Sequence, residues 1–320
     1  MTDLGSLAQQ TADDLARTRA GVVVAVLSGD DSEIRSAGRV TADDVFEIGS
    51  ITKVFTALTL ARMTVDGSVS LGEPLAGLLP SGASVPSRDG VQITLQHLAT
   101  HTAGLPRLPT GMLKRLLLHP NDPDPYARCT TDMLLAALAR TRLAAPPGKR
   151  FRYSNFGAGL LGLALARRAG TPYTQLVLEK TGLPQPDPSL LVQGHTRRGR
   201  ETPPWHLADL AGAGALHSTA ADLLAFLRRQ LDDPDDPAIH LTRSVKHQIN
   251  PFTWVHLGWM GRRLHARLGS QTQLWHNGGT SGFTSFAGFD PEHRTAVVLL
   301  SSTQRLMDKE AGDLLRALSA

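Results

Sequence analysis

Cysteine and long apolar runs are the two features that this sequence lacks most clearly. Cys129 is the only cysteine among 320 residues, so no intrachain disulfide is possible and a structural role is expected for it. No run of about eighteen apolar residues occurs, so we expect no membrane-spanning helix. The first twenty residues carry acidic side chains such as Asp13 and Asp14, where a signal peptide would be apolar. With Met1 as the natural start, the expected location is cytoplasmic.

A basic tract with interleaved aromatic residues is also missing. The net charge of +4 and the pI near 9.5 are compatible with nucleic-acid binding. However, the nearest basic cluster is only Arg197, Arg198 and Arg200, in a stretch rich in proline and glycine. We interpret this cluster as a solvated loop and expect no nucleic-acid partner. The sequence leaves the oligomeric state open.

The order of the predicted elements indicates one antiparallel sheet built from both ends of the chain. Strand patterns cover residues 21–27, 33–38, 273–276, 283–289 and 296–301. Helical patterns cover residues 94–100, 130–143, 155–168, 172–180 and 307–318. We therefore predict an α/β (α+β) fold in which helices flank the sheet and a mainly helical lobe is inserted into it. Two long irregular segments, 105–128 and 185–205, are interpreted either as lids or as surface excursions.

The segment from Ser50 to Lys53 carries the first chemical signal. Ile51, Val54, Phe55 and Leu58 form one apolar stripe of a helix, so Ser50 lies at its start and Lys53 one turn further on. A lysine whose pKa is lowered by burial can take the proton of a neighbouring serine. Taken alone, these residues also fit a serine N-cap beside a solvated lysine.

Two further motifs follow in order along the chain. Tyr153 and Asn155 flank a serine after a turn rich in proline and glycine. The third motif, His276-Asn277-Gly278-Gly279, ends an extended segment. Supporting stretches are 98–106, 212–222, 258–259 and 279–283.

Together these motifs resemble the serine β-lactamase and penicillin-recognising family. The tyrosine of the second motif resembles the class C branch, which contains β-lactamases, D-alanyl-D-alanine carboxypeptidases, D-aminopeptidases and esterases. The resemblance spans roughly residues 22–300. It implies a β-lactamase/transpeptidase-like fold with a sheet lobe (1–66 and 211–320), a helical lobe (67–210) and a catalytic cleft between them.

The resemblance also implies the roles of the site residues. Ser50 would be the nucleophile, Lys53 the amine that receives its proton, and Tyr153 a second general base or acid. The backbone amides of Ser50 and Gly279 would form the oxyanion hole. The substrate ligands would be Asn155, which would bind Lys53 or a substrate amide, together with His276, Asn277 and Gly278. No cofactor or metal is implied, and the expected partner is a small-molecule acyl substrate (ester, amide or β-lactam).

His276 departs from the family pattern, in which a lysine is common at this position. Histidine is largely uncharged at neutral pH, so binding of a substrate carboxylate should weaken. We therefore predict that esters and amides are better substrates than β-lactams. We also expect that lowering the pH toward about 6 charges His276 and favours cephalosporins.

Other functions stay open at this point. An acyltransferase, a β-lactamase, a D-Ala-D-Ala peptidase and a penicillin-binding sensor without turnover could all use the same acyl-enzyme. A metal site is a competing interpretation, because His97 and His101 have the four-residue spacing of helical zinc ligands. No His-Glu-x-x-His motif or third ligand accompanies them.

Overall fold

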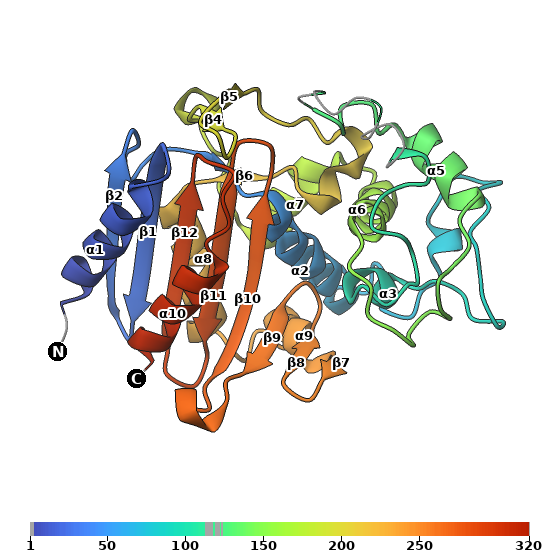
Figure 1. Cartoon of the computed structure of the whole chain (residues 1–320). Coiled ribbons are helices and arrows are strands. Elements are labelled where there is room, and N and C mark those ends of the chain that lie inside the picture. The colour runs from blue at the N-terminus through green and yellow to red at the C-terminus, as the bar shows by residue number, and fades with distance from the viewer. Residues whose placement is uncertain (1–2, 113–117, 119–121, 123, 320) are drawn as a thin grey trace.

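An eight-stranded antiparallel sheet forms the centre of the molecule (Figure 1). The computed structural model describes residues 3–112, 118, 122 and 124–319. The strand order is β2-β1-β12-β11-β10-β9-β8-β7. The strands are β1 (Gly21–Ser28), β2 (Asp31–Gly38), β7 (His247–Asn250), β8 (Thr253–Val255), β9 (Met260–Arg263), β10 (Thr272–Gly279), β11 (Thr284–Asp290) and β12 (Thr295–Ser301). Two short ladders join β3 (Phe46–Glu47) to β6 (His217–Ser218) and β4 (Gly194–His195) to β5 (Glu201–Thr202).

The two ends of the chain meet inside this sheet. β1 pairs with β2 as the predicted hairpin, and on its other side it pairs with β12, where Val22 lies opposite Ser301. β10, β11 and β12 follow one another in antiparallel register. The predicted fold class is therefore confirmed, because strands from distant parts of the sequence share one antiparallel sheet with helices on both faces.

Helices cover both faces, which explains why β1 is an unbroken apolar run. Even-numbered residues from Val22 to Val26 pack in a cluster with α1 (Leu4–Ala16) and α10 (Asp308–Leu318). Odd-numbered residues from Val23 to Leu27 pack in a second cluster with α2 (Thr52–Val65) and α8 (Ala220–Asp232). In Figure 1, α1 and α10 lie in front of the sheet and α8 lies behind it.

α2 lies between the sheet and the other helices. Phe55 and Leu58 belong to the cluster beneath the sheet, whereas Leu60 and Met63 belong to a third cluster. The third cluster includes residues of α3 (Leu95–Ala99), α5 (Thr131–Ala139) and α6 (Asn155–Ala169). α7 (Tyr173–Thr181) adds Val177 to the sheet-side cluster. The lobe boundaries at 66/67 and 210/211 stay a prediction.

Several elements differ from the sequence expectation. The predicted helix 130–143 ends at Ala139, because Ala144 is drawn into a backbone hydrogen bond of 2.9 Å with Gly104. The expected strand 273–276 extends over the whole of β10, since it pairs with both β9 and β11. α9 (Pro237–Ser244) and the strands β7–β9 carried no clear sequence signal. Most of the apolar segment 112–118 lies outside the described residues.

Among the described helices, none combines the length and the apolar character that crossing a membrane requires.

Candidate active site

Ser50 and Lys53 lie side by side where the chain enters α2. Ser50 occupies a 3-10 turn, η1 (Gly49–Ile51), and Lys53 lies in the first turn of α2. The three-residue spacing puts both side chains on one face. Lys53 Nζ donates a hydrogen bond of 2.8 Å to Ser50 Oγ and another of 2.6 Å to the carbonyl oxygen of Ala213. The structure therefore brings the predicted pair together, and the serine precedes the first α-helical residue by two positions.

Burial favours the neutral form of the Lys53 amine. The side chain is only 3% exposed. Desolvation, followed by the nearby charge of Arg107, lowers the pKa of Lys53 well below its ordinary value. An unprotonated amine at hydrogen-bond distance from a hydroxyl can accept its proton. The pair thus has the geometry and the electrostatics of a nucleophile and its base.

Tyr153 approaches the pair from the start of α6. Ser154 caps this helix by accepting a 2.8 Å hydrogen bond from the amide of Gly157, which fixes the backbone next to Tyr153. Lys53 Nζ lies 5.0 Å from the centroid of the Tyr153 ring, and the Tyr153 hydroxyl hydrogen-bonds with Ser50. Burial raises the pKa of Tyr153 to about 12. At neutral pH the side chain is therefore a phenol, which can donate a proton but is not itself a base.

Asn155 borders the same cavity but forms no hydrogen bond with Lys53. Its side chain hydrogen-bonds with Tyr126. Its Oδ1 atom is buried without a hydrogen-bond partner in the described part of the chain. An unsatisfied buried acceptor costs about 1–3 kcal/mol. Of the two contacts expected for Asn155, the geometry therefore fits a substrate amide better than Lys53.

His276 and Asn277 lie on opposite faces of β10, because successive strand residues alternate. The His276 ring lies 6.2 Å from the Tyr153 ring between centroids. Its Nδ1 donates a 2.6 Å hydrogen bond to the carbonyl oxygen of Asn277. The Asn277 side chain instead donates to Asp308, the first residue of α10. Asn277, which we expected among the substrate ligands, thus fastens α10 to the sheet and lies outside the group around Ser50.

The His276 ring is neutral over a wide pH range. The side chain is 2% exposed. Desolvation, followed by the electrostatic interaction with Lys53, lowers the pKa of His276 to about 3. The expectation that a pH near 6 charges this residue is therefore wrong. The sequence shows a histidine near the end of a strand, but it does not show how deeply that strand is covered.

Two glycines allow β10 to lie directly against the Ser50 turn. A Cβ atom on Gly278 would lie 2.2 Å from the carbonyl oxygen of Ile48 and 3.0 Å from the amide nitrogen of Ser50. Gly49 has a φ of +49°, and a Cβ there would lie 2.7 Å from the amide nitrogen of Gly279. This approach brings Ser50 and Gly279 together at one small cavity. Two backbone amides beside a nucleophile are the groups that an oxyanion hole requires.

Aromatic side chains from the two long irregular segments line this cavity. Tyr126 and Trp205 are in contact, with ring centroids 4.7 Å apart, and both border the space next to Ser50. Trp205 Nε1 donates a 2.8 Å hydrogen bond to Ser281 Oγ, and its backbone amide donates one of 2.6 Å to Glu47. No sequence pattern marks these residues as part of the site, because their position depends on contacts between distant segments.

Arg107 and His101 also border Tyr153. The guanidinium carbon of Arg107 lies 5.3 Å from the centroid of the Tyr153 ring, and the His101 ring lies 4.5 Å from it. His101 Nδ1 accepts a 3.2 Å hydrogen bond from the amide of Ser154. Desolvation lowers the pKa of His101 well below its ordinary value. His101 belongs to the supporting stretch 98–106, and Arg107 follows directly after it, so proximity in sequence was the available signal.

The Nδ1 atoms of His97 and His101, the alternative metal ligands, both accept hydrogen bonds from backbone amides. His97 Nδ1 accepts an amide within the capping box of α3. His101 lies beyond the end of that helix, with a φ of +56°. In the described ranges, the group of side chains that converges as metal ligands could is Asp290, Glu292 and His293, at the turn between β11 and β12. The structure thus offers no joint site for His97 and His101.

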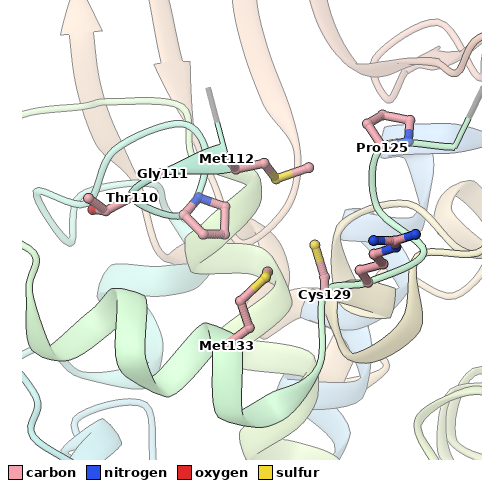
Figure 2. A pocket seen from close by; sticks show the side chains of 8 residues that line it. Thr110, Gly111, Met112, Pro125, Cys129 and Met133 are labelled. Carbon is pink, nitrogen blue, oxygen red and sulfur yellow. The ribbon is translucent and has the colours of Figure 1, made fainter. Parts of the chain in front are cut away.

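Cys129 faces a separate pocket (Figure 2). Its thiol and the thioethers of Met112 and Met133 line this space, together with backbone and side chains of the flanking loop. The residues that surround Ser50 are not among its lining. Cys129 is buried and thus contributes to packing beside the helix α5.

With this geometry established, comparison with known proteins decides the family. A family model described as Beta-lactamase matches residues 7–320, which is nearly the whole chain. This chain belongs to the beta-lactamase family. All three motifs named from the sequence lie within the matched residues.

Relatives in this family differ in their named activities. The D-alanyl-D-alanine-carboxypeptidase/endopeptidase AmpH of Escherichia coli is 33% identical over 66% of this chain. This chain spans only 57% of the length of AmpH. A Beta-lactamase of Pseudomonas fluorescens is 25% identical, with 94% of each chain covered. The structure of a Beta-lactamase/D-alanine Carboxypeptidase from Yersinia pestis matches with a TM-score of 0.79 and 24% identity over 99% of this chain and 98% of that one. A D-stereospecific amidohydrolase from Streptomyces sp. matches with a TM-score of 0.74 and 23% identity over 96% of each. The beta-lactamase fold is thus shared across several hydrolase types.

Proposed function

We propose that the chain is a serine hydrolase that cleaves a small ester or amide through an acyl-enzyme on Ser50. The observation that carries this proposal is the 2.8 Å hydrogen bond between Ser50 Oγ and the buried amine of Lys53, whose pKa is lowered well below its ordinary value. A serine hydroxyl is a weak nucleophile until a neighbouring base takes its proton. Membership of the beta-lactamase family supports the same reaction type.

Acylation divides the proton transfers between two side chains. Ser50 Oγ attacks the acyl carbon while Lys53 takes its proton, and the amides of Ser50 and Gly279 bind the developing oxyanion. Tyr153, a phenol with a pKa of about 12, donates its proton to the leaving oxygen or nitrogen. The Lys53 ammonium then returns a proton to the tyrosine. The bond from Oγ to the acyl carbon forms, the bond to the leaving group breaks, and both side chains regain their starting state.

Deacylation repeats this sequence with water as the nucleophile. The proton of the attacking water passes through Tyr153 and Lys53 to Ser50 Oγ, which is the leaving group of this step. An amine or alcohol in place of water would give the acyltransferase reaction.

The pH dependence of kcat/KM for a neutral ester should follow Lys53. Below its lowered pKa the amine is protonated and cannot accept the serine proton, so the rate should rise with pH through that value. It should then stay level, because the Tyr153 phenol ionises only near pH 12 and the His276 pKa of about 3 lies below the assay range. Initial rates between about pH 5 and pH 10 measure this profile. A falling limb centred between about pH 7 and pH 9 would contradict the roles given to Lys53 and Tyr153.

Short-chain p-nitrophenyl esters should have a higher kcat/KM than cephalosporins. The neutral His276 offers no positive charge to the carboxylate of a β-lactam. A hydrogen bond to a charged group contributes about 1.5–3 kcal/mol, so its loss should lower cephalosporin turnover by roughly one to two orders of magnitude. Esters of several chain lengths and nitrocefin, assayed side by side, measure the difference.

Two variants at position 276 serve as test and control. His276→Lys should raise nitrocefin turnover relative to esters, whereas the neutral His276→Gln should leave this ratio near that of the unmodified enzyme. If the unmodified enzyme hydrolyses nitrocefin faster than every ester, beta-lactamase is the better description of its activity.

A D-alanyl-D-alanine peptidase is the second candidate function. The 33% identity to AmpH, a carboxypeptidase/endopeptidase by name, favours it. Release of D-alanine from a peptide ending in D-Ala-D-Ala, compared with turnover of D-amino acid amides and esters, separates the two candidates.

The cytoplasmic location stays a prediction, and fractionation of the producing cells tests it.

A further inference from the structure

Arg107 places a positive charge on the Tyr153 side of the cavity. Its side chain is exposed, and its guanidinium carbon lies 5.3 Å from the centroid of the Tyr153 ring. Its charge acts on Lys53, Tyr153 and Tyr126, in each case lowering the pKa. Arg107 is not among the groups that shift the pKa of His276. The cationic side of the site therefore lies next to Tyr153 and Tyr126, away from His276.

The backbone of Arg107 is held by the same helix start that positions the site. Its carbonyl oxygen accepts hydrogen bonds of 3.0 Å from the amide of Asn155 and 3.2 Å from that of Phe156. The preceding carbonyl, that of Pro106, accepts a 2.6 Å hydrogen bond from Ser154 Oγ. Arg107 is thus fixed at its Cα atom relative to Tyr153 and Asn155, while its guanidinium extends toward solvent.

No carboxylate of the described chain neutralises this guanidinium by an ion pair. The acids that act on this part of the cavity have other partners. Asp124 accepts the backbone amide of His206 and those of the turn at residues 126–127. Glu47 accepts the backbone amide of Trp205. A planar guanidinium whose backbone is held beside Tyr153, and which has no ion pair with an acid of the described residues, is suited to bind an anionic group of a ligand through paired N–H donors.

We propose that Arg107 is a specificity-determining residue that binds a carboxylate of the substrate. This proposal rests on the proposed serine hydrolase function and adds a substrate class to it. The site then selects acyl substrates with an anionic group directed toward Tyr153. The residue that binds this group, Arg107, lies in the segment after α3. The neutral His276 leaves β10 without the charge that the family commonly has there. A β-lactam carboxylate directed toward β10 would not reach this anchor.

Three phenyl esters of matched length test the proposal. Phenyl hexanoate is neutral, monophenyl adipate carries a carboxylate on the acyl side, and 3-carboxyphenyl hexanoate carries one on the leaving group. The readout is the ratio of kcat/KM between each anionic ester and the neutral one, in the unmodified protein, Arg107→Gln, Arg107→Lys and Arg142→Gln. Arg142 is a matched control, because it is exposed in the helical region and has no ion pair in the described ranges.

Arg107→Gln should lower one of the two ratios by roughly tenfold to a hundredfold. Arg107→Lys should retain part of the preference for that anionic ester. Arg142→Gln should leave both ratios unchanged. The ester that responds identifies the side of the scissile bond that carries the carboxylate. If phenyl hexanoate is turned over and Arg107→Gln changes neither ratio, the anchor is refuted while the proposed function stands.

Binding without turnover provides a second measurement. Phenylboronic acid and 3-carboxyphenylboronic acid form reversible adducts with a nucleophilic serine, and calorimetry gives their dissociation constants. The carboxylated compound should bind more tightly, and Arg107→Gln should remove most of that preference. Equal preference in both proteins overturns the anchor. If no ester is turned over and neither boronic acid binds, the proposed function fails, and the anchor fails with it.

Discussion

Ser50→Ala is expected to lower kcat/KM for every substrate of the enzyme by about four orders of magnitude or more. The variant removes the atom that forms the acyl-enzyme, which lies 2.8 Å from the Lys53 amine. The fold should persist, because the substitution removes one oxygen from a partly exposed side chain. Initial rates with p-nitrophenyl esters, together with circular dichroism, measure both effects.

Covalent labelling gives the control for this prediction. A fluorophosphonate should modify the unmodified protein at Ser50 alone, and Ser50→Ala should not be labelled. Peptide mass mapping identifies the labelled residue. Label on Ser154, which caps α6, or on Ser281, which accepts from Trp205, would show that the nucleophile is misassigned.

Lys53→Met should lower kcat by about two orders of magnitude or more, the usual scale for loss of a general base. Methionine has a similar length, so it should fill the buried space while leaving Ser50 without a proton acceptor. The carbonyl of Ala213 loses its 2.6 Å hydrogen bond, and a buried acceptor without a partner costs about 1–3 kcal/mol. Thermal unfolding and esterase rates measure stability and activity separately.

Lys53→Arg distinguishes a base from a positive charge. An arginine keeps hydrogen-bond donors but does not release its proton at accessible pH, so the variant should be about as slow as Lys53→Met. Recovery of most of the activity in Lys53→Arg would mean that residue 53 acts by charge, and the proposed proton transfer would be wrong.

The parts of the fold that could be predicted are those with their own periodicity or turn chemistry. β1 and β12 are apolar runs, and α6 is capped by Ser154 before its first residue and by Gly170, with a φ of +66°, after its last. β8, by contrast, has only three residues and exists because β7 and β9 supply its hydrogen bonds. α9 has only eight residues, and this shortness makes it hard to recognise. Pairing partners that lie elsewhere in the sequence leave no local pattern.

The candidate site shows the same division. Ser50 and Lys53 are joined by helical spacing, so their contact follows from the sequence itself. The expectation that the Asn277 side chain binds the substrate does not match its contact with Asp308. The motif gives the order of residues but not the face of the strand on which each side chain lies. Arg107 and Trp205 reach the cavity only through the path of two irregular segments, and no spacing rule describes such a path.

The position of α2 has a consequence for the cooperativity of unfolding. This helix carries both Ser50's neighbour Lys53 and apolar residues that belong to two of the hydrophobic clusters. Separation of the clusters would expose α2 to water, so neither can open without weakening the other. Loss of the contact between Ser50 and Lys53 and loss of the global structure should therefore coincide in denaturant, and the amides of α2 should be among the slowest of the molecule to exchange with solvent.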